Sequence, residues 1–255
     1  MMLVDDLLAY LFAGRPHVLA TPMAHWLATS RRFTAFVTDF RPKIRRKLWA
    51  TEEIESLLDL RLELETAYRL LGERSFNVMY EPLRLGQTRG PDFAVSYTTS
   101  TLFMVEVTRL RITQDSPRGF AQATAPAALT TTAPTSSPAE ERLTEIVCTK
   151  LGQLPPQRSN VLLVGVDGVR LTPDILRAAM IRLQQKAERN DAAYLQRHRF
   201  RDRADFFSHY QRLSELLVRR PELQADAPVI GWINPQAKYP LPSKVRTALY
   251  RSHRS

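Results

Sequence analysis

The chain has 255 residues, of which 44% are hydrophobic and 24% are charged, a balance typical of a folded globular protein. Its 36 Lys and Arg residues outnumber its 26 Asp and Glu residues, so the formal net charge is +10 and favours a polyanionic partner. The single cysteine, Cys148, excludes an internal disulfide framework and a cysteine-rich zinc site. No apolar run reaches the roughly 18 residues that span a bilayer. We therefore expect a cytoplasmic protein with no membrane partner.

Residues 1–50 are predicted to form a basic extension of short helices. In the stretch 31–47, seven Lys and Arg residues accompany one acid, Asp39. Three aromatic residues recur at spacings of three and four and so share one helical face: Phe33, Phe36 and Phe40. Two interpretations of this stretch are open, namely the solvated basic side of an amphipathic helix and an arm that contacts phosphate groups.

The clearest helix is predicted over Thr51–Leu71. Thr51 suits the N-cap position, and acids follow it in the first turn, where they complement the helix dipole. Gly72 supplies a C-terminal stop. The apolar stripe of this helix repeats at helical spacing and consists of Leu57, Leu60, Leu64, Ala67 and Leu71.

The hydrophobic period then changes to that of β-strands. Apolar and β-branched residues predict strands over 76–80, 92–97 and 102–108. Four small polar residues, 98–101, separate the last two strands and can turn the chain. These two strands are therefore predicted to form a hairpin.

The segment 113–138 is dominated by Ala, Thr, Ser and Pro. Such a segment cannot bury enough apolar surface to offset its ordering entropy, so we predict a disordered insertion. A helix is predicted over 138–154. The continuous apolar run 160–166 is typical of a strand that is covered on both faces.

Residues 171–255 are predicted to form a helical C-terminal region that packs on the core domain, 51–170. Helices are expected over about 172–189 and 202–218, with a short strand at 229–233. The basic stretch Arg197–Arg203 is either a solvated turn or a contact to a phosphate backbone. The element order predicts an α/β protein with a mixed central sheet.

Asp92 and Glu106 are the strongest candidates for a functional site. If the hairpin turns near Thr99, strand alternation places the two residues opposite each other on one face. Directly paired residues have Cβ atoms about 4.5–5.5 Å apart, where like charges repel. Two carboxylates in such a poorly solvated place favour a hard divalent cation, Mg²⁺ or Mn²⁺. The alternative is a pair of rim carboxylates, each solvated or bonded to an arginine.

The motif Gly90-Pro91-Asp92-Phe93, followed by Glu106-Val107-Thr108, resembles the PD-(D/E)XK nuclease superfamily. The predicted order of helix, three strands, helix and strand is similar to that superfamily's core, so the resemblance covers about 51–166 and implies a restriction-endonuclease-like core. In the family, the Asp and Glu hold the catalytic metal, and a Glu on the preceding helix often joins them. Glu63 is the best match for that helical acid and Glu65 is the second choice. The alternative for both is a solvated helix face.

The chain departs from the family two positions after Glu106, where Thr108 replaces a lysine. That lysine normally orients the attacking water and stabilises developing negative charge. The family can place it on another element, and the helix after the hairpin is a candidate. Lys150 and Gln153 share one face of that helix. The alternative is a lysine whose stem lies along apolar residues while its charge reaches water.

The resemblance implies a divalent-metal-dependent nuclease that hydrolyses phosphodiester bonds in DNA, with RNA as the second choice. Asp92, Glu106 and Glu63 would ligate Mg²⁺ or Mn²⁺. Lys150 and Gln153 would position water or phosphate. Because the motif lysine is missing, a second hypothesis is a catalytically inactive nuclease fold that binds nucleic acid or takes part in protein assembly, with a protein partner or a homodimer left open.

Overall fold

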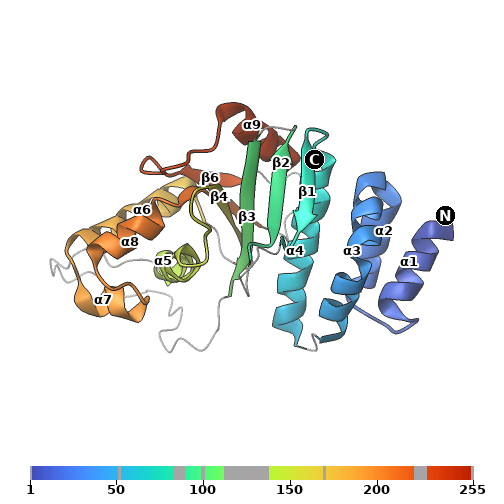
Figure 1. The fold of residues 1–255 in the computed structure, drawn as a ribbon. Coiled ribbons are helices and arrows are strands. Elements are labelled where there is room, and N and C mark those ends of the chain that lie inside the picture. The colour runs from blue at the N-terminus through green and yellow to red at the C-terminus, as the bar shows by residue number, and fades with distance from the viewer. Residues whose placement is uncertain are drawn as a thin grey trace, which may run out of the picture.

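The computed structural model describes residues 2–50, 53–82, 90–98, 101–111, 138–168, 171–220 and 229–253. Within these ranges the chain is an α/β protein with one six-stranded mixed sheet and nine helices (Figure 1). No helix in these ranges is both long enough and apolar enough to cross a membrane. The predicted insertion, 113–138, lies outside the described residues except for Pro138, which begins a helix.

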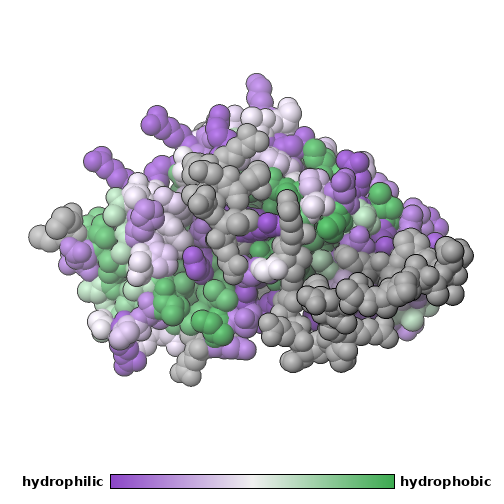
Figure 2. Space-filling view, turned by 180° about the vertical axis from the view of Figure 1, so that it is seen from behind, coloured by the Kyte–Doolittle hydropathy of each residue, from purple (hydrophilic) through white to green (hydrophobic). Residues whose placement is uncertain are grey.

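Three helices precede the core: α1 (Met2–Phe12), α2 (Ala20–Thr29) and α3 (Arg31–Ala50). The predicted aromatic face of α3 is confirmed, because Phe36 lies 6.0 Å from Phe33 and 5.0 Å from Phe40 between ring centroids. Figure 1 shows these helices stacked outside the next helix, on its far side from the sheet. Seen from behind, hydrophilic residues interrupt the hydrophobic ones over this end of the molecule (Figure 2).

Helix α4 (Ile54–Gly72) positions one of the predicted acids. It begins with Glu53 at the N-cap position, so the predicted start at Thr51 is wrong. Its apolar stripe is buried from Leu60 onward and packs against strands β1 and β3. The helix therefore covers one face of the sheet, as the stripe predicts.

Six strands form the sheet in their chain order: β1 (Phe76–Tyr80), β2 (Phe93–Tyr97), β3 (Thr101–Leu110), β4 (Ser159–Val166), β5 (Leu213–Arg219) and β6 (Ile230–Ile233). β1, β2 and β3 are antiparallel, β4 and β5 continue parallel to β3, and β6 is antiparallel to β5. Tyr97 pairs with Thr101, so β2 and β3 have the register that the predicted hairpin requires. Helix α5 (Pro138–Leu151) connects β3 to β4, and the predicted order of core elements is confirmed.

Two helical layers enclose the sheet. The side chains of β4 alternate between them, because Val161 and Leu163 join the core under α4 while Leu162 and Val164 join the core under α5. The remaining described helices are α6 (Pro173–Glu188), α7 (Ala192–Arg197), α8 (Arg203–Tyr210) and α9 (Ser243–Ser252). α9 contacts α4, whereas α6 to α8 lie beside α5 on the opposite face (Figure 1).

The prediction of one helix over 202–218 is wrong. α8 ends at Tyr210, and β5 follows with all seven of its residues buried. A strand that is covered on both faces loses the alternation of apolar and polar residues by which strands are recognised. Two strands of the C-terminal region, β5 and β6, therefore extend the central sheet.

Candidate active site

Asp92 and Glu106 lie opposite each other across the β2–β3 hairpin. The register pairs Phe93 with Val105, and one further step along it brings Asp92 to Glu106. Residues opposite each other in an antiparallel pair project on the same face of the sheet. Asp92 is half-buried, whereas Glu106 is only 6% exposed. The juxtaposition that the sequence predicts is thus present in the fold.

A hydrogen bond orients the Asp92 carboxyl, and the surroundings of this carboxyl disfavour its charged form. Its Oδ2 accepts a hydrogen bond of 2.7 Å from the backbone N–H of Val107. Burial, followed by the nearby charges of Glu106 and Glu63, raises the pKa of Asp92 to about 8, against the opposing effects of the Val107 hydrogen bond and the Lys150 charge. The carboxyl groups of Asp92, Glu106 and Glu63, from the start of β2, from β3 and from α4, therefore influence one another electrostatically.

Helix α5 brings a cation to these carboxylates. Lys150 Nζ donates a hydrogen bond of 2.7 Å to Glu106 Oε1 and another of 3.2 Å to Gln153 Oε1. The side chain of Lys150 is 16% exposed. Its charge is directed at Glu106 rather than at open solvent, so the alternative of a lysine that only reaches water does not describe it.

Glu63 approaches from α4 and is held by a lysine that sequence reasoning did not single out. Lys47 of α3 donates a hydrogen bond of 2.6 Å to Glu63 Oε1, and its Nζ lies 2.7 Å from Glu81 Oε1. Burial alone would lower the pKa of Lys47, but the two carboxylates raise it above its ordinary value. Lys47 belongs to the basic stretch 31–47, yet no local spacing connects it with Glu63.

Tyr80, the last residue of β1, lies beside Lys47 and Glu63. Lys47 Nζ lies 4.9 Å from the centroid of its ring. The Tyr80 hydroxyl is buried and has no hydrogen-bond partner within the described residues. Burial, followed by the nearby Glu63 carboxylate, raises the pKa of Tyr80 well above its ordinary range. The hydroxyl therefore stays protonated beside the carboxylates.

Glu65, the second choice for the helical acid, lies elsewhere. Its Oε1 pairs with the buried guanidinium of Arg219 on β5 and lies 3.4 Å from Arg69 Nε. Two residues along a helix correspond to a rotation of about 200°, so Glu63 and Glu65 point to different surroundings. Thr108 is half-buried on β3 and brings no charge to the site.

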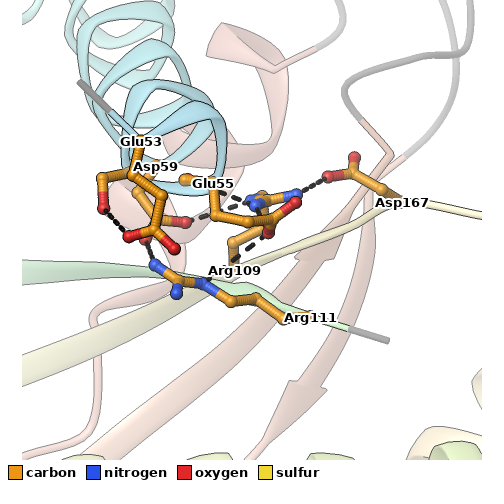
Figure 3. A network of polar contacts seen from close by, with 7 residues as sticks. Glu53, Glu55, Asp59, Arg109, Arg111 and Asp167 are labelled. Carbon is orange, nitrogen blue, oxygen red and sulfur yellow. Dashed lines mark hydrogen bonds and ion pairs between the residues drawn. The ribbon is translucent and has the colours of Figure 1, made fainter. Parts of the chain in front are cut away.

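A second ionic group, which we call the Arg109 clamp, joins the ends of β3 and β4 to α4. Arg109 contacts three carboxylates from two segments, α4 and the end of β4 (Figure 3), with Nε 3.0 Å from Asp59 Oδ1, Nη1 2.6 Å from Asp167 Oδ2, and a further pair to Glu55. Arg111 also pairs with Asp59. Asp59 lies one turn before Glu63 on α4, and Arg109 lies three residues after Glu106 on β3. The clamp therefore fixes the two elements that supply these site acids.

The donor chemistry of the site suits Mg²⁺ or Mn²⁺, although no cluster of three or more His, Cys, Asp or Glu side chains arranged for a metal occurs in the described part of the chain. Mg²⁺ commonly uses one or two protein carboxylates together with waters and substrate phosphates. Asp92 and Glu106 provide such a pair, and burial together with the neighbouring carboxylates raises the pKa of Asp92. Glu63 could join them only by opening its ion pair with Lys47.

Comparisons with known proteins do not identify the chain: no family model, no curated protein and no solved structure matches it. The residues and geometry of this site are therefore the basis on which a function can be inferred.

Proposed function

We propose that the protein is a divalent-metal-dependent nuclease of the PD-(D/E)XK type, with a restriction-endonuclease-like core, and that it hydrolyses phosphodiester bonds in DNA, with RNA as the second choice. The observation that carries the proposal is the meeting of Asp92, which directly precedes β2, with Glu106 of β3 and Lys150 of α5. The element order from α4 to β4 agrees with the core that the sequence resemblance implies.

Asp92 and Glu106 would hold Mg²⁺ or Mn²⁺ between them. When bound, such an ion stabilises charge on the phosphoryl oxygens and lowers the pKa of an attacking water. The Val107 N–H keeps one Asp92 oxygen oriented. Glu63 would support the site from α4, with Lys47 balancing its charge.

Lys150 would take the role of the missing motif lysine. Its ammonium group contacts Glu106 in the structure, and a cation in that place can orient a water or a phosphate oxygen and stabilise developing negative charge. Gln153 accepts a hydrogen bond from Lys150 and so restrains the direction of Nζ. Thr108 cannot supply this charge.

The test is cleavage of supercoiled plasmid DNA by the purified full chain in Mg²⁺, in Mn²⁺ and in EDTA. We expect nicking only with the ions, and a rate that falls at least about a hundredfold in Asp92→Asn, because a ligand that holds the metal is lost. The matched control is Asp174→Asn, which makes the same change at an exposed position on α6. Equal nicking by Asp92→Asn and the wild type would show that the assignment is wrong.

A catalytically inactive nucleic-acid-binding or protein-assembly component is the second candidate. It is favoured by one observation, namely that Glu106 and Glu63 are each already paired with a lysine. A binding module predicts equal affinity for DNA in Mg²⁺ and in EDTA, with no cleavage in either. An assembly component predicts no salt-dependent affinity for DNA, whereas a phosphate binder weakens steeply as salt increases.

A further inference from the structure

The basic stretch 31–47 divides into groups by what its side chains contact. Arg32 donates hydrogen bonds to the backbone carbonyls of Leu71 and Glu73 and so fastens α3 to the end of α4. Lys47 forms ion pairs with Glu63 and Glu81 at the candidate active site. Arg41 and Arg45 take part in neither arrangement, because they lie against aromatic rings on the side of α3 that faces α1.

These rings and guanidinium groups form an alternating row, which we call the arginine–aromatic ladder. Its members in order are Arg15, Trp49, Arg45, Tyr10 and Arg41. The guanidinium carbons lie 4.5, 5.3, 4.8 and 5.5 Å from the neighbouring ring centroids along this order. The ladder connects α3 with α1 and with the turn that follows α1.

The ladder is held in place by its rings. Trp49 Nε1 donates a hydrogen bond of 2.9 Å to the backbone carbonyl of Leu11, although the residue is 40% exposed. Tyr10 is half-buried and packs against the hydrophobic core. A guanidinium stacked on a fixed ring loses less freedom when it binds a ligand, and its N–H edges can still form the planar fork that fits phosphate.

The three arginines of the ladder have no acidic partner in the part of the chain that the structure describes. Asp6, one turn before Tyr10 on α1, pairs with none of them. The other basic stretch, Arg197–Arg203, differs in this respect, because Arg197 pairs with Glu145 and Arg201 pairs with Asp205. The ladder therefore carries oriented positive charge that is not balanced within the described residues.

We propose that the arginine–aromatic ladder binds the phosphate backbone of double-stranded DNA. The proposal rests on the proposed function for its class of partner, and it adds the surface that holds this partner. Two guanidinium groups lie within 5.3 Å of the centroid of the Trp49 ring, so they compete with a base for stacking on it. The ladder therefore contacts phosphates and does not read sequence.

Helix α3 links the ladder to the candidate active site. Lys47 lies on the side of α3 that faces α4, whereas Arg45 lies on the side that faces α1. Figure 1 shows α1 to α3 extending the molecule beyond α4. DNA that reaches both surfaces would thus be held at a distance from the cleaved bond. The ladder would add affinity without taking part in the chemistry.

The experiment measures binding of a fluorescein-labelled 30-base-pair duplex to the full chain by anisotropy, in EDTA, over a range of salt concentrations. In Arg41→Gln/Arg45→Gln we expect affinity about tenfold or more weaker near 0.1 M salt. The slope of log K against log salt should fall by nearly 2, since each phosphate contact contributes about 0.9. The matched control is Arg177→Gln/Arg189→Gln, which removes the same charge from exposed positions on and after α6. It should change affinity less than about twofold.

A third variant separates orientation from charge. Trp49→Leu keeps every arginine and should weaken binding while the salt slope stays close to that of the wild type. Thermal unfolding of each variant shows whether the fold is retained. Equal weakening by the ladder variant and its control, or unchanged binding by the ladder variant, overturns the proposal.

Failure of this proposal can be distinguished from failure of the proposed function. Binding that depends on the ladder, together with no cleavage in Mg²⁺ or Mn²⁺, refutes the nuclease and supports the ladder. Cleavage that depends on Asp92, together with binding that is indifferent to Arg41 and Arg45, refutes the ladder and supports the nuclease.

Discussion

The candidate active site and the Arg109 clamp share α4 and β3, but they balance charge in opposite ways. In the clamp, one buried guanidinium is matched by three carboxylates, and Arg111 adds a second cation. At the site, Lys150 pairs with Glu106, and Asp92 has no ion pair of its own within the described residues. Burial, followed by the charges of Glu106 and Glu63, raises the pKa of Asp92 to about 8.

This contrast separates a structural ionic group from one that is suited to function. The carboxylates of the clamp already have their cations, so the clamp gains little from a ligand and can hold elements together. The site is short of positive charge in a place that solvent reaches poorly, and a folded protein gains stability there when a cation binds. Perturbed carboxyl groups of this kind concentrate at functional sites.

The largest effect should come from the titration of Asp92. The pKa of Asp92 is raised from 3.8 to about 8 in the folded state. The contribution of Asp92 to the free energy of unfolding is therefore fully present below pH 4 and is lost as the pH rises through 8. At about 1.4 kcal/mol for each unit of pKa, the loss amounts to several kcal/mol. We expect Asp92→Asn to remove this part of the pH dependence of the urea-unfolding free energy.

Mg²⁺ sharpens the same measurement. At pH 8 the ion should stabilise the wild type against urea, because it compensates the charges of Asp92 and Glu106, and it should have little effect on Asp92→Asn. Parallel pH profiles for the two proteins, or equal stabilisation by Mg²⁺, would contradict the view that the site lacks a cation.

The hairpin carboxylates were predictable because they depend only on local rules. Strand alternation and a turn centred at position 99 are enough to bring Asp92 opposite Glu106. Lys150 could be predicted as a candidate because it is a lysine among apolar helix positions. Whether Glu63 or Glu65 faces the site depends on the rotation of α4, which the tertiary packing decides.

The partners of Lys47 and Arg109 were not predictable in the same way. Lys47 meets Glu63 across a separation of 16 residues, and Arg109 meets Asp59 and Asp167 across separations of 50 and 58. No periodicity relates such positions, so only the folded chain reveals them. β5 escaped prediction for a different reason, because burial on both faces removed its alternating pattern.

The next largest effect is expected at the clamp. Arg109→Met leaves Glu55, Asp59 and Asp167 close together without their shared cation. Breaking a buried ion pair commonly costs about 3–5 kcal/mol. Because the Glu55 and Asp59 side chains are 41% and 38% exposed, and water can partly solvate them, we expect a loss of about 2–3 kcal/mol. Urea unfolding at pH 7 measures it.

Arg111→Gln is the matched control for the clamp. Its side chain is 45% exposed, so its pairs should contribute no more than about 0.5 kcal/mol. A loss in Arg109→Met as small as that in Arg111→Gln would contradict the structural role of the clamp.

The smallest effect on stability, and the most specific one on chemistry, is expected for Lys150→Met. Removing the ammonium leaves Glu106 without its cation and should cost about 1–2 kcal/mol at pH 8. The same loss makes the surroundings of the carboxylate pair more negatively charged, so Mg²⁺ should stabilise this variant at least as well as it stabilises the wild type. Cleavage should nevertheless fall by about 10²–10³-fold, because the group that stabilises developing charge is gone. Mg²⁺ titrations of thermal unfolding, measured beside plasmid nicking, separate the two effects.

If cleavage survives in Lys150→Met, the relocated-lysine role is wrong. If metal binding disappears together with cleavage, Lys150 acts by holding Glu106 in place rather than on the reacting phosphate.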